Sequence, residues 1–283
     1  MPTSSVVSNI ASCQGCGRYC SSNATIRFMG KLLCKQCISV KHVTKDDWTK
    51  LAFTESLHRK HVFALFSGGK DSLCALAYVK EIVCKLNPRP SLTALHADTT
   101  ISLPEVMPYV RNICEMLGVS LAVLKPEKDF ATLVKEWGLP SIWKRWCCRE
   151  LKIKPIRNYV LPFEDRVVFD GIRAEESRKR AGYNPIFWHR GFQCFSISPI
   201  FYWTEREVDQ YLLSKRLPIS PLYRSIGFSG ECVCGAYLNE ERFKKLKIHH
   251  SDFFNKLAQI EGNVRTGYTF LYKDGERRPL KEL

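Results

Sequence analysis

Short apolar runs alternate with longer amphipathic segments through the middle of the chain. Each run has the length of a buried strand and is bounded by turn-forming or polar residues. The runs cover residues 63–66, 91–98, 119–124 and 166–170. Apolar residues with helical spacing follow at 106–117, and a helix-compatible segment extends from residue 70 to about Lys85. Strands that alternate with helices predict an α/β fold with a doubly wound, mostly parallel sheet.

Local signals mark several boundaries. The segment Asn87-Pro-Arg-Pro90 predicts the end of the first helix, because proline cannot continue it. Thr204 with Glu207 three residues later forms a capping box and predicts a helix start. The pattern divides the chain into a small N-terminal unit in residues 1–44, a linker helix in 45–60, an α/β domain in 61–200 and a C-terminal segment in 201–283 with a helical extension.

Composition narrows the class of protein. The chain has 283 residues and 45% apolar content, enough for one sizeable core and a small appended unit. No window approaches 18 uninterrupted apolar residues, and the first residues do not form a secretory signal, so we expect a cytoplasmic protein without a membrane partner. A net charge of +15 favours polyanionic partners, a nucleic acid among them.

Cysteine is frequent, with 13 residues. In a reducing compartment, clustered cysteines are more often metal ligands or reactive groups than disulfides. Two CxxC pairs, Cys13 with Cys16 and Cys34 with Cys37, have the spacing of a zinc ribbon that holds one Zn²⁺ through four thiolates. The β-like patch Thr25–Phe28 between them predicts two small hairpins. Such a small unit needs a staple, so this zinc is expected to be structural, with Cys20 as a spare.

The turn Ser67-Gly68-Gly69-Lys70-Asp71-Ser72 joins the first strand to its helix. Backbone N–H groups, a helix N-terminus, a lysine and hydroxyls around one turn form an anion cradle. The turn resembles the SGGxDS pyrophosphate loop of the ATP pyrophosphatase (adenine nucleotide alpha hydrolase) superfamily. That resemblance implies ATP as ligand, with Mg²⁺ held by Asp71 or Asp98, and Lys70 offsetting charge on the leaving pyrophosphate.

Later motifs narrow the resemblance to the phosphoadenylyl-sulfate (PAPS) reductase family. His96-Ala-Asp98-Thr before Pro104-Glu105, Cys147-Cys148 before Lys152, and Gly171-Ile-Arg173 each match its pattern. The resemblance implies nucleotide contacts at Ser67, Gly68, Gly69, Lys70, Asp71, Ser72, His96, Asp98, Gly171 and Arg173. It places the catalytic groups at Cys147, Cys148, Lys70 and Asp71.

A second cysteine set follows from the same resemblance. The adenylylsulfate reductase branch carries [4Fe-4S] ligands as a Cys-Cys pair and a CxxC, which here correspond to Cys147, Cys148, Cys232 and Cys234. This chain has CxC in place of CxxC. A three-cysteine cluster with a free iron site is one outcome, and a second zinc is the competing one.

Two departures from the reductases separate the possible functions. The chain lacks a terminal Glu-Cys-Gly-x-His motif, while its pyrophosphate loop is intact. We therefore expect an ATP-dependent sulfurtransferase that adenylates a nucleic-acid oxygen and replaces it with sulfur from an iron–sulfur cluster or a cysteine persulfide. The preferred candidate for that oxygen is a tRNA base carbonyl. The alternative is an adenylylsulfate or phosphoadenylylsulfate reductase. DNA phosphorothioation and a non-catalytic zinc-ribbon protein remain further alternatives. Expected partners are ATP or adenylylated sulfate, tRNA, a sulfur or electron donor protein, and a second copy as a homodimer.

Overall fold

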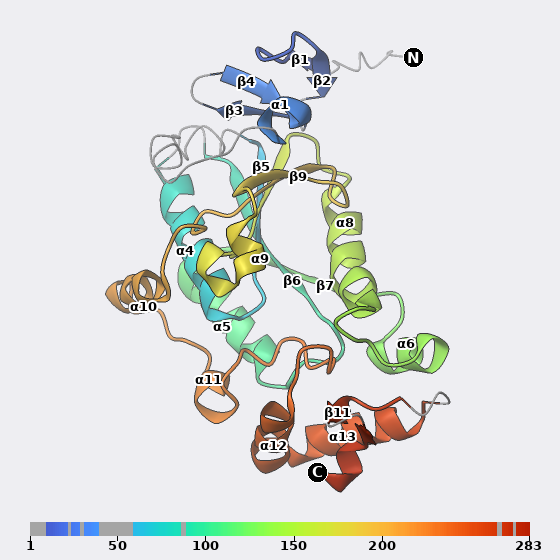
Figure 1. The fold of residues 1–283 in the computed structure, drawn as a ribbon. Coiled ribbons are helices and arrows are strands. Elements are labelled where there is room, and N and C mark those ends of the chain that lie inside the picture. Colours follow the sequence, from blue (N-terminus) through green and yellow to red (C-terminus); the bar gives the residue numbers. More distant parts are fainter. Residues whose placement is uncertain are drawn as a thin grey trace, which may run out of the picture.

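The computed structural model describes residues 10–21, 24–28, 31–39, 59–85, 89–264, 268–273 and 276–283. A six-stranded sheet lies at its centre in the order β7-β6-β5-β8-β10-β9 (Figure 1). The bounds are His61–Leu65 for β5, Ser91–Ala97 for β6, Ser120–Leu124 for β7, Arg166–Phe169 for β8, Ile186–His189 for β9 and Cys194–Ile197 for β10. All paired neighbours are parallel except β9 with β10. The predicted α/β fold with a mostly parallel sheet is confirmed.

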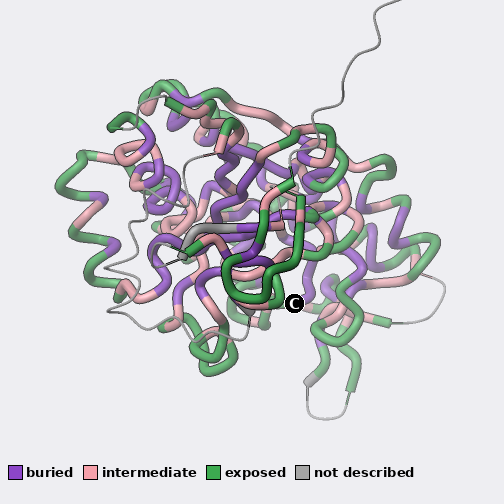
Figure 2. The backbone as a smooth tube through the Cα atoms, turned by 90° about the horizontal axis from the view of Figure 1, so that it is seen from above, coloured by how far each residue is buried: buried purple, intermediate pink, exposed green. Residues whose placement is uncertain are grey.

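Helices cover both faces of this sheet. Alternate side chains of a strand point to opposite faces, so Val62 and Ala64 of β5 join one core cluster and Phe63 joins the other. Helices α4 (Lys70–Val83) and α5 (Val106–Leu117) pack into the first cluster, and α8 (Lys154–Val160) packs into the second. Figure 2 shows the buried segments in the middle of the molecule and the exposed ones around them.

Shorter helices connect and extend this core. They are α6 Phe130–Trp137, α7 Trp146–Cys148, a π-helix Arg149–Ile153, α9 Arg178–Ala181, α10 Glu205–Ser214, α11 Leu222–Ser225, α12 Glu240–His249 and α13 Ser251–Gly262, with 3₁₀ turns at Ala174–Glu176 and Leu280–Glu282. A last hairpin pairs β11 (Leu271–Lys273) with β12 (Glu276–Arg278). No helix among these described residues combines the length and apolar character that crossing a bilayer requires.

The N-terminal unit consists of two antiparallel hairpins and a short helix. The hairpins pair β1 (Ile10–Ser12) with β2 (Tyr19–Ser21), and β3 (Thr25–Phe28) with β4 (Lys31–Cys34), before α1 (Lys35–Ser39). The two predicted hairpins are therefore confirmed. Arg59, just before β5, donates hydrogen bonds to the Thr25 carbonyl and to Asp165, which precedes β8. The unit thus meets the amino edge of the sheet, and Figure 1 places α12 and α13 at the opposite end of the molecule.

Most expected elements of the central domain form within two residues of their predicted bounds. Helix α4 ends at Val83 rather than near Lys85, and the capping box of Thr204 and Glu207 is present at α10. The β9–β10 hairpin was not predicted from the sequence. The predicted linker helix of residues 45–60 falls largely outside the described part of the chain, which omits residues 40–58. The bounds of the four predicted domains stay predictions.

Candidate functional site

The Ser67–Ser72 loop connects the carboxyl end of β5 to the N-terminus of α4. Its side chains bond back onto its own backbone: Ser67 N–H donates to Ser72 Oγ at 3.3 Å, Gly69 N–H donates to Ser67 Oγ at 3.3 Å, and Ser72 Oγ donates to the Gly69 carbonyl at 2.9 Å. Gly68 has φ +83°, in the left-handed region that favours glycine. The loop is therefore a fixed turn at the positive end of a helix dipole.

The segment that follows β8 packs directly against this turn. A Cβ added at Gly171 would lie 2.8 Å from the Ser72 nitrogen and 2.9 Å from the Asp71 carbonyl, so only glycine allows the two backbones to approach this closely. Two residues later, Arg173 Nε donates to Asp71 Oδ1 at 3.0 Å, and its Nη1 donates to Glu175 at 2.8 Å. The sheet order places these segments together, because β8 lies beside β5.

The ammonium of Lys70 is held by two carboxylates of α10. Its Nζ lies 2.8 Å from Glu205 Oε1 and 2.9 Å from Asp209 Oδ1. Burial lowers the pKa of Lys70, but the hydrogen bonds to Glu205 and Asp209 raise it by more than burial lowers it. The lysine therefore stays charged. Its backbone N–H donates to the Tyr223 hydroxyl at 3.0 Å. Sequence reasoning assigned no role to Glu205, Asp209 or Tyr223, because each lies more than 130 positions from Lys70 in the chain.

A pocket of about 320 Å³ opens at this loop. Six of the predicted nucleotide-binding residues line it: Ser67, Gly69, Lys70, Asp71, Ser72 and Gly171. Ser229 also lines it, and its Cβ would lie 3.8 Å from a Cβ added at Gly69. The other four predicted residues, Gly68, His96, Asp98 and Arg173, do not line this pocket, although Arg173 is bonded to the lining residue Asp71. His96 is buried, and its Nδ1 lies 2.8 Å from the Phe66 carbonyl just before the loop.

The second cysteine set lies along a neighbouring pair of segments. The connection after β6 pairs with the segment before Cys234: Leu103 N–H donates to the Gly230 carbonyl at 3.0 Å, and Val233 N–H donates to the Ile101 carbonyl at 2.9 Å. This pairing brings the Cys234 sulfur within 3.6 Å of the Cys147 sulfur. The π-helix that follows Cys148 is a distortion found often at functional sites.

The four thiols influence each other's protonation. Hydrogen bonding with Cys148 raises the pKa of Cys147 to about 12 and lowers the pKa of Cys148. Hydrogen bonding with Cys147 raises the pKa of Cys234 to about 11, and a bond with Cys234, together with burial, raises the pKa of Cys232. Cys148 is therefore the member of this set with the most thiolate character.

An ion pair between a half-buried lysine and a buried glutamate adjoins this thiol set. Lys152 Nζ lies 2.6 Å from Glu231 Oε2. Burial lowers the pKa of Lys152, but the charge of Glu231 and the hydrogen bond to it outweigh burial and raise the pKa. Sequence reasoning missed Glu231, although its place directly before Cys232 was an available signal.

Residues 61–230 match the model of the phosphoadenosine phosphosulfate reductase domain. The chain belongs to that family. It is 32% identical over 225 residues to an uncharacterized protein of Methanocaldococcus jannaschii, a match that covers 77% of this chain and 44% of the relative. It is 29% identical over 136 residues to the adenosine 5'-phosphosulfate reductase of Salinibacter ruber, covering 47% of this chain and 53% of the relative. The chain spans about half the length of these two curated relatives.

Among solved structures, this member of the reductase domain family is similar to the U34-tRNA thiolase NcsA from Methanococcus maripaludis with its [4Fe-4S] cluster. The identity is 18%, the TM-score is 0.48, and the match covers 90% of this chain and 87% of that one. The family match ends at residue 230, so Cys232, Cys234 and the N-terminal cysteines lie outside it.

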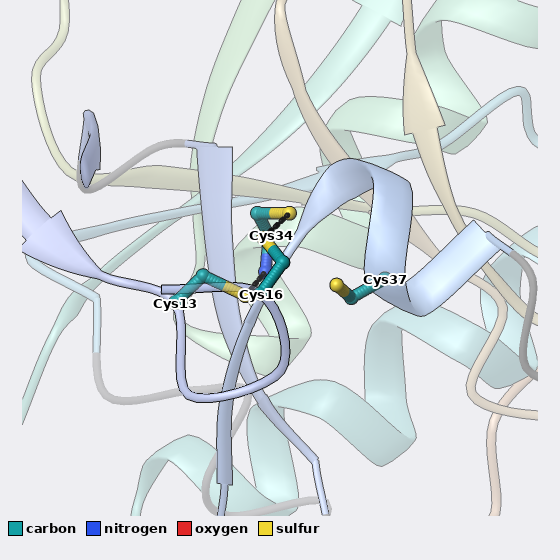
Figure 3. A group of neighbouring side chains, drawn as sticks. All are labelled: Cys13, Cys16, Cys34 and Cys37. Carbon is teal, nitrogen blue, oxygen red and sulfur yellow. Dashed lines mark hydrogen bonds between the residues drawn. The ribbon is translucent and has the colours of Figure 1, made fainter. Parts of the chain in front are cut away.

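The N-terminal cysteines of this family member form a compact group (Figure 3). The sulfur atoms of Cys13, Cys16, Cys34 and Cys37 all lie within 4.8 Å of one another, and no other group of three or more ligands does so among the described residues. Tetrahedral Zn–S bonds of about 2.3 Å place sulfurs about 3.8 Å apart, so the group fits one zinc ion. Burial raises the pKa of Cys13, but N–H groups of Cys34 and Gly15 donate to its sulfur and lower the pKa to about 6.

Proposed function

We propose that this protein is an ATP-dependent sulfurtransferase. It adenylates an oxygen of a nucleic acid, first among the candidates a tRNA base carbonyl, and replaces that oxygen with sulfur carried at its second cysteine set. Membership of the reductase domain family supports an enzyme that handles an adenine nucleotide and sulfur. The choice of reaction rests on the arrangement of the loop and the thiols.

One observation carries the proposal: the pocket at the Ser67–Ser72 loop and the thiol set share one segment of chain. Ser229 lines the pocket beside Gly69, and Cys232 follows three residues later. Three residues span at most about 11 Å, so the Cα of Cys232 lies within that distance of the Cα of Ser229. A nucleotide phosphate in the pocket and a sulfur on the cysteines would then both lie within reach of one bound nucleic-acid base.

The first step is phosphoryl chemistry at the loop. The acceptor oxygen attacks the α-phosphorus of ATP, the bond to the β-phosphate breaks, and pyrophosphate leaves. When bound, Mg²⁺ would offset negative charge on the phosphates. Ser67, Gly69 and Ser72 would cradle that pyrophosphate at the helix N-terminus, and Lys70 and Arg173 would offset its charge. Asp71, already bonded to Arg173, and Asp98 are the candidate carboxylates for the metal ion.

The second step is sulfur transfer. The terminal sulfur of a persulfide on one cysteine attacks the activated carbon, and AMP leaves with the original oxygen. A neighbouring thiolate then attacks the Sγ of the cysteine that carried the persulfide, and the bond from that Sγ to the transferred sulfur breaks. This step releases the thiolated product and leaves a Cys–Cys disulfide. The 3.6 Å separation of Cys147 and Cys234 suits this second attack. An external dithiol must reduce the disulfide, and a sulfane-sulfur donor must reload the persulfide, before the next turnover.

The thiol set is also the candidate holder of an iron–sulfur group, because cysteines from two segments of the chain meet here. Cys147, Cys148, Cys232 and Cys234 would hold it. When bound, such a cluster supplies an iron site that holds inorganic sulfide. Lys152 would balance the negative charge of the thiolates beside it.

A reductase is the second candidate. The relative from Salinibacter ruber is named as an adenosine 5'-phosphosulfate reductase, and thiols as close as Cys147 and Cys234 can form the disulfide that sulfite release leaves. This reaction needs adenylylsulfate and a dithiol reductant, and it does not need ATP.

The deciding experiment is anaerobic purification followed by iron, zinc and sulfide analysis, and then by pyrophosphate release from ATP with and without total tRNA. We expect tRNA to stimulate pyrophosphate release and thiolated nucleosides to appear in the digested tRNA. Sulfite from adenylylsulfate, with no iron and no need for ATP, would sink the sulfurtransferase proposal in favour of the reductase.

Two cysteine variants test which residues hold the iron and carry out thiolation. Cys148→Ala should remove bound iron and thiolation, whereas Cys114→Ala should change neither, because Cys114 is a buried core residue of α5. Equal loss in both variants, or in neither, would show that the ligand set is wrong.

A further inference from the structure

A groove of about 640 Å³ adjoins the second cysteine set. One wall is the loop of residues 140–143, which leads into Cys147. The other walls are the segment that begins at Gly235, directly after Cys234, and the C-terminal hairpin of β11 and β12. Both thiol-bearing segments therefore continue into this surface, which we call the Trp143 groove.

Aromatic side chains on this groove are left in water. Trp143 is 92% exposed, Tyr272 72% and Tyr268 57%. Tyr237, between two lining residues, is also 57% exposed. Four of the five aromatic side chains that are more than half exposed in the described chain thus lie at one place. Aromatic rings of this size normally gain stability from burial, so their exposure here indicates a surface that meets a ligand.

Guanidinium groups are interleaved with these rings. The Arg277 guanidinium lies 3.9 Å from the centre of the Tyr268 ring, and Arg278 lines the groove beside it. Arg145, two residues after Trp143, donates to the Tyr237 hydroxyl. Glu240 also lines the groove, and its carboxylate is paired with Lys244 at 2.7 Å. The surface therefore combines flat apolar faces with positive charge.

The groove is built into the fold rather than left by a mobile end. Gly235 has φ +83°, and a Cβ there would lie 2.1 Å from the Phe270 ring, so the ring packs directly on that glycine. Buried Glu261 accepts hydrogen bonds from Phe270 N–H at 2.7 Å and from Leu280 N–H at 2.6 Å. These contacts fix the C-terminal hairpin against the segment that follows Cys234.

We propose that the Trp143 groove binds an unpaired segment of RNA, stacking bases on Trp143, Tyr268 and Tyr272 and pairing phosphates with Arg277 and Arg278. Every base offers a planar face to an aromatic ring, and guanidinium groups match phosphate oxygens. The net charge of +15 favours the same polyanion. Because the groove adjoins the second cysteine set, an RNA bound there would have a base close to the transferable sulfur. In that respect the inference rests on the proposed function.

The test measures RNA binding without ATP, by fluorescence anisotropy of a labelled single-stranded RNA 12-mer and of the same strand in a duplex. We expect the single strand to bind more tightly. Trp143→Ala and Tyr272→Ala should each weaken its binding about five- to 150-fold, the range of one lost base stack, while Trp143→Phe should retain most of it. Arg277→Ala with Arg278→Ala should make the plot of log affinity against log salt shallower by about 1.4.

Exposed residues elsewhere supply the controls. Leu213→Ala on α10, 80% exposed, and Arg111→Ala on α5 should leave binding unchanged. Unchanged binding in Trp143→Ala, equal affinity for the duplex, or loss in Tyr19→Ala of the N-terminal unit instead would overturn the inference. Pyrophosphate release distinguishes the two proposals: RNA bound through the groove without release refutes only the function, and release that persists in Trp143→Ala with unchanged binding refutes only the groove.

Discussion

Gly171 marks the place where two backbones meet at the candidate nucleotide site. No side chain fits there, since even a methyl group would lie under 3.0 Å from the nitrogen of Ser72 and from the Asp71 backbone. Backbone atoms cannot swing aside as the end of a long side chain can. A larger residue at position 171 must therefore displace the backbone of the loop itself.

Gly171→Ala should weaken ATP binding about five- to 150-fold, because overpacking of about 1–3 kcal/mol displaces the turn that cradles phosphate. Titration calorimetry with ATP measures this. Gly182→Ala is the matched control, since a Cβ there would meet only the Lys179 carbonyl at 3.7 Å. Equal ATP affinity in both variants would remove the loop from the nucleotide site.

Lys70 makes a second residue-scale case, because its carboxylate partners compete with any phosphate. Glu205→Gln should tighten ATP binding about two- to fivefold, the range for an exposed ion pair. The hydrogen bond from Lys70 lowers the pKa of Glu205 below its ordinary 4.5. A carboxyl with a lowered folded pKa keeps its contribution above the unfolded pKa and loses it as the pH falls through the folded value. The gain in the variant should thus persist from pH 8 to pH 5.

Glu241→Gln provides the comparison for this measurement. Glu241 is an exposed glutamate paired with Lys245 on α12, away from the loop. Its loss should leave ATP affinity unchanged, and tighter binding in both variants would mean a general charge effect.

At the scale of elements, the N-terminal hairpins depend on their four cysteines. The strands β1 to β4 have three or four residues each, too few to bury a core that would hold them alone. A metal ion that joins Cys13 and Cys16 to Cys34 and Cys37 would supply the missing stability.

We predict that Cys37→Ser releases one zinc per chain and opens residues 24–39 to hydrogen exchange, whereas Cys20→Ser does neither. Metal analysis and exchange mass spectrometry measure both. Zinc binding should weaken as the pH falls, because protons compete with the metal ion for the four thiolates. Zinc loss in Cys20→Ser alone would reassign the ligands.

At the scale of the whole molecule, the N-terminal unit and the candidate nucleotide site lie at opposite edges of the sheet. Arg59 and Asp165 tie the unit to the starts of β5 and β8, while the Ser67–Ser72 loop follows the far end of β5. The side chains of Arg59 and Asp165 are only 12% and 19% exposed. This placement favours a structural role for the unit over contact with the reacting groups.

Arg59→Ala should loosen the N-terminal unit and leave the nucleotide site intact. Losing hydrogen bonds to a charged group costs about 1.5–3 kcal/mol, so exchange in residues 24–39 should rise about 10- to 150-fold with ATP affinity unchanged. Arg111→Ala on the exposed side of α5 should change neither quantity. A fall in ATP affinity in Arg59→Ala would show that the two edges are coupled.

The sequence alone determined the features that depend on neighbouring residues. The strand–loop–helix order around Ser67–Ser72, the capping box at Thr204 and the two CxxC pairs are local patterns, because backbone geometry and ligand spacing act over a few positions. The β9–β10 hairpin was missed since its pairing depends on a place beside β8 rather than on a strong local turn.

Only the tertiary structure decided which distant residues meet. Gly171 against Ser72, Lys70 between Glu205 and Asp209, and Cys147 beside Cys234 are contacts across 87 to 139 positions. Such contacts follow from sheet order and from the pairing of residues 101–103 with 230–233, which no local periodicity encodes. The same is true of the Trp143 groove, whose rings come from segments on either side of the cysteines and gather only when the chain folds.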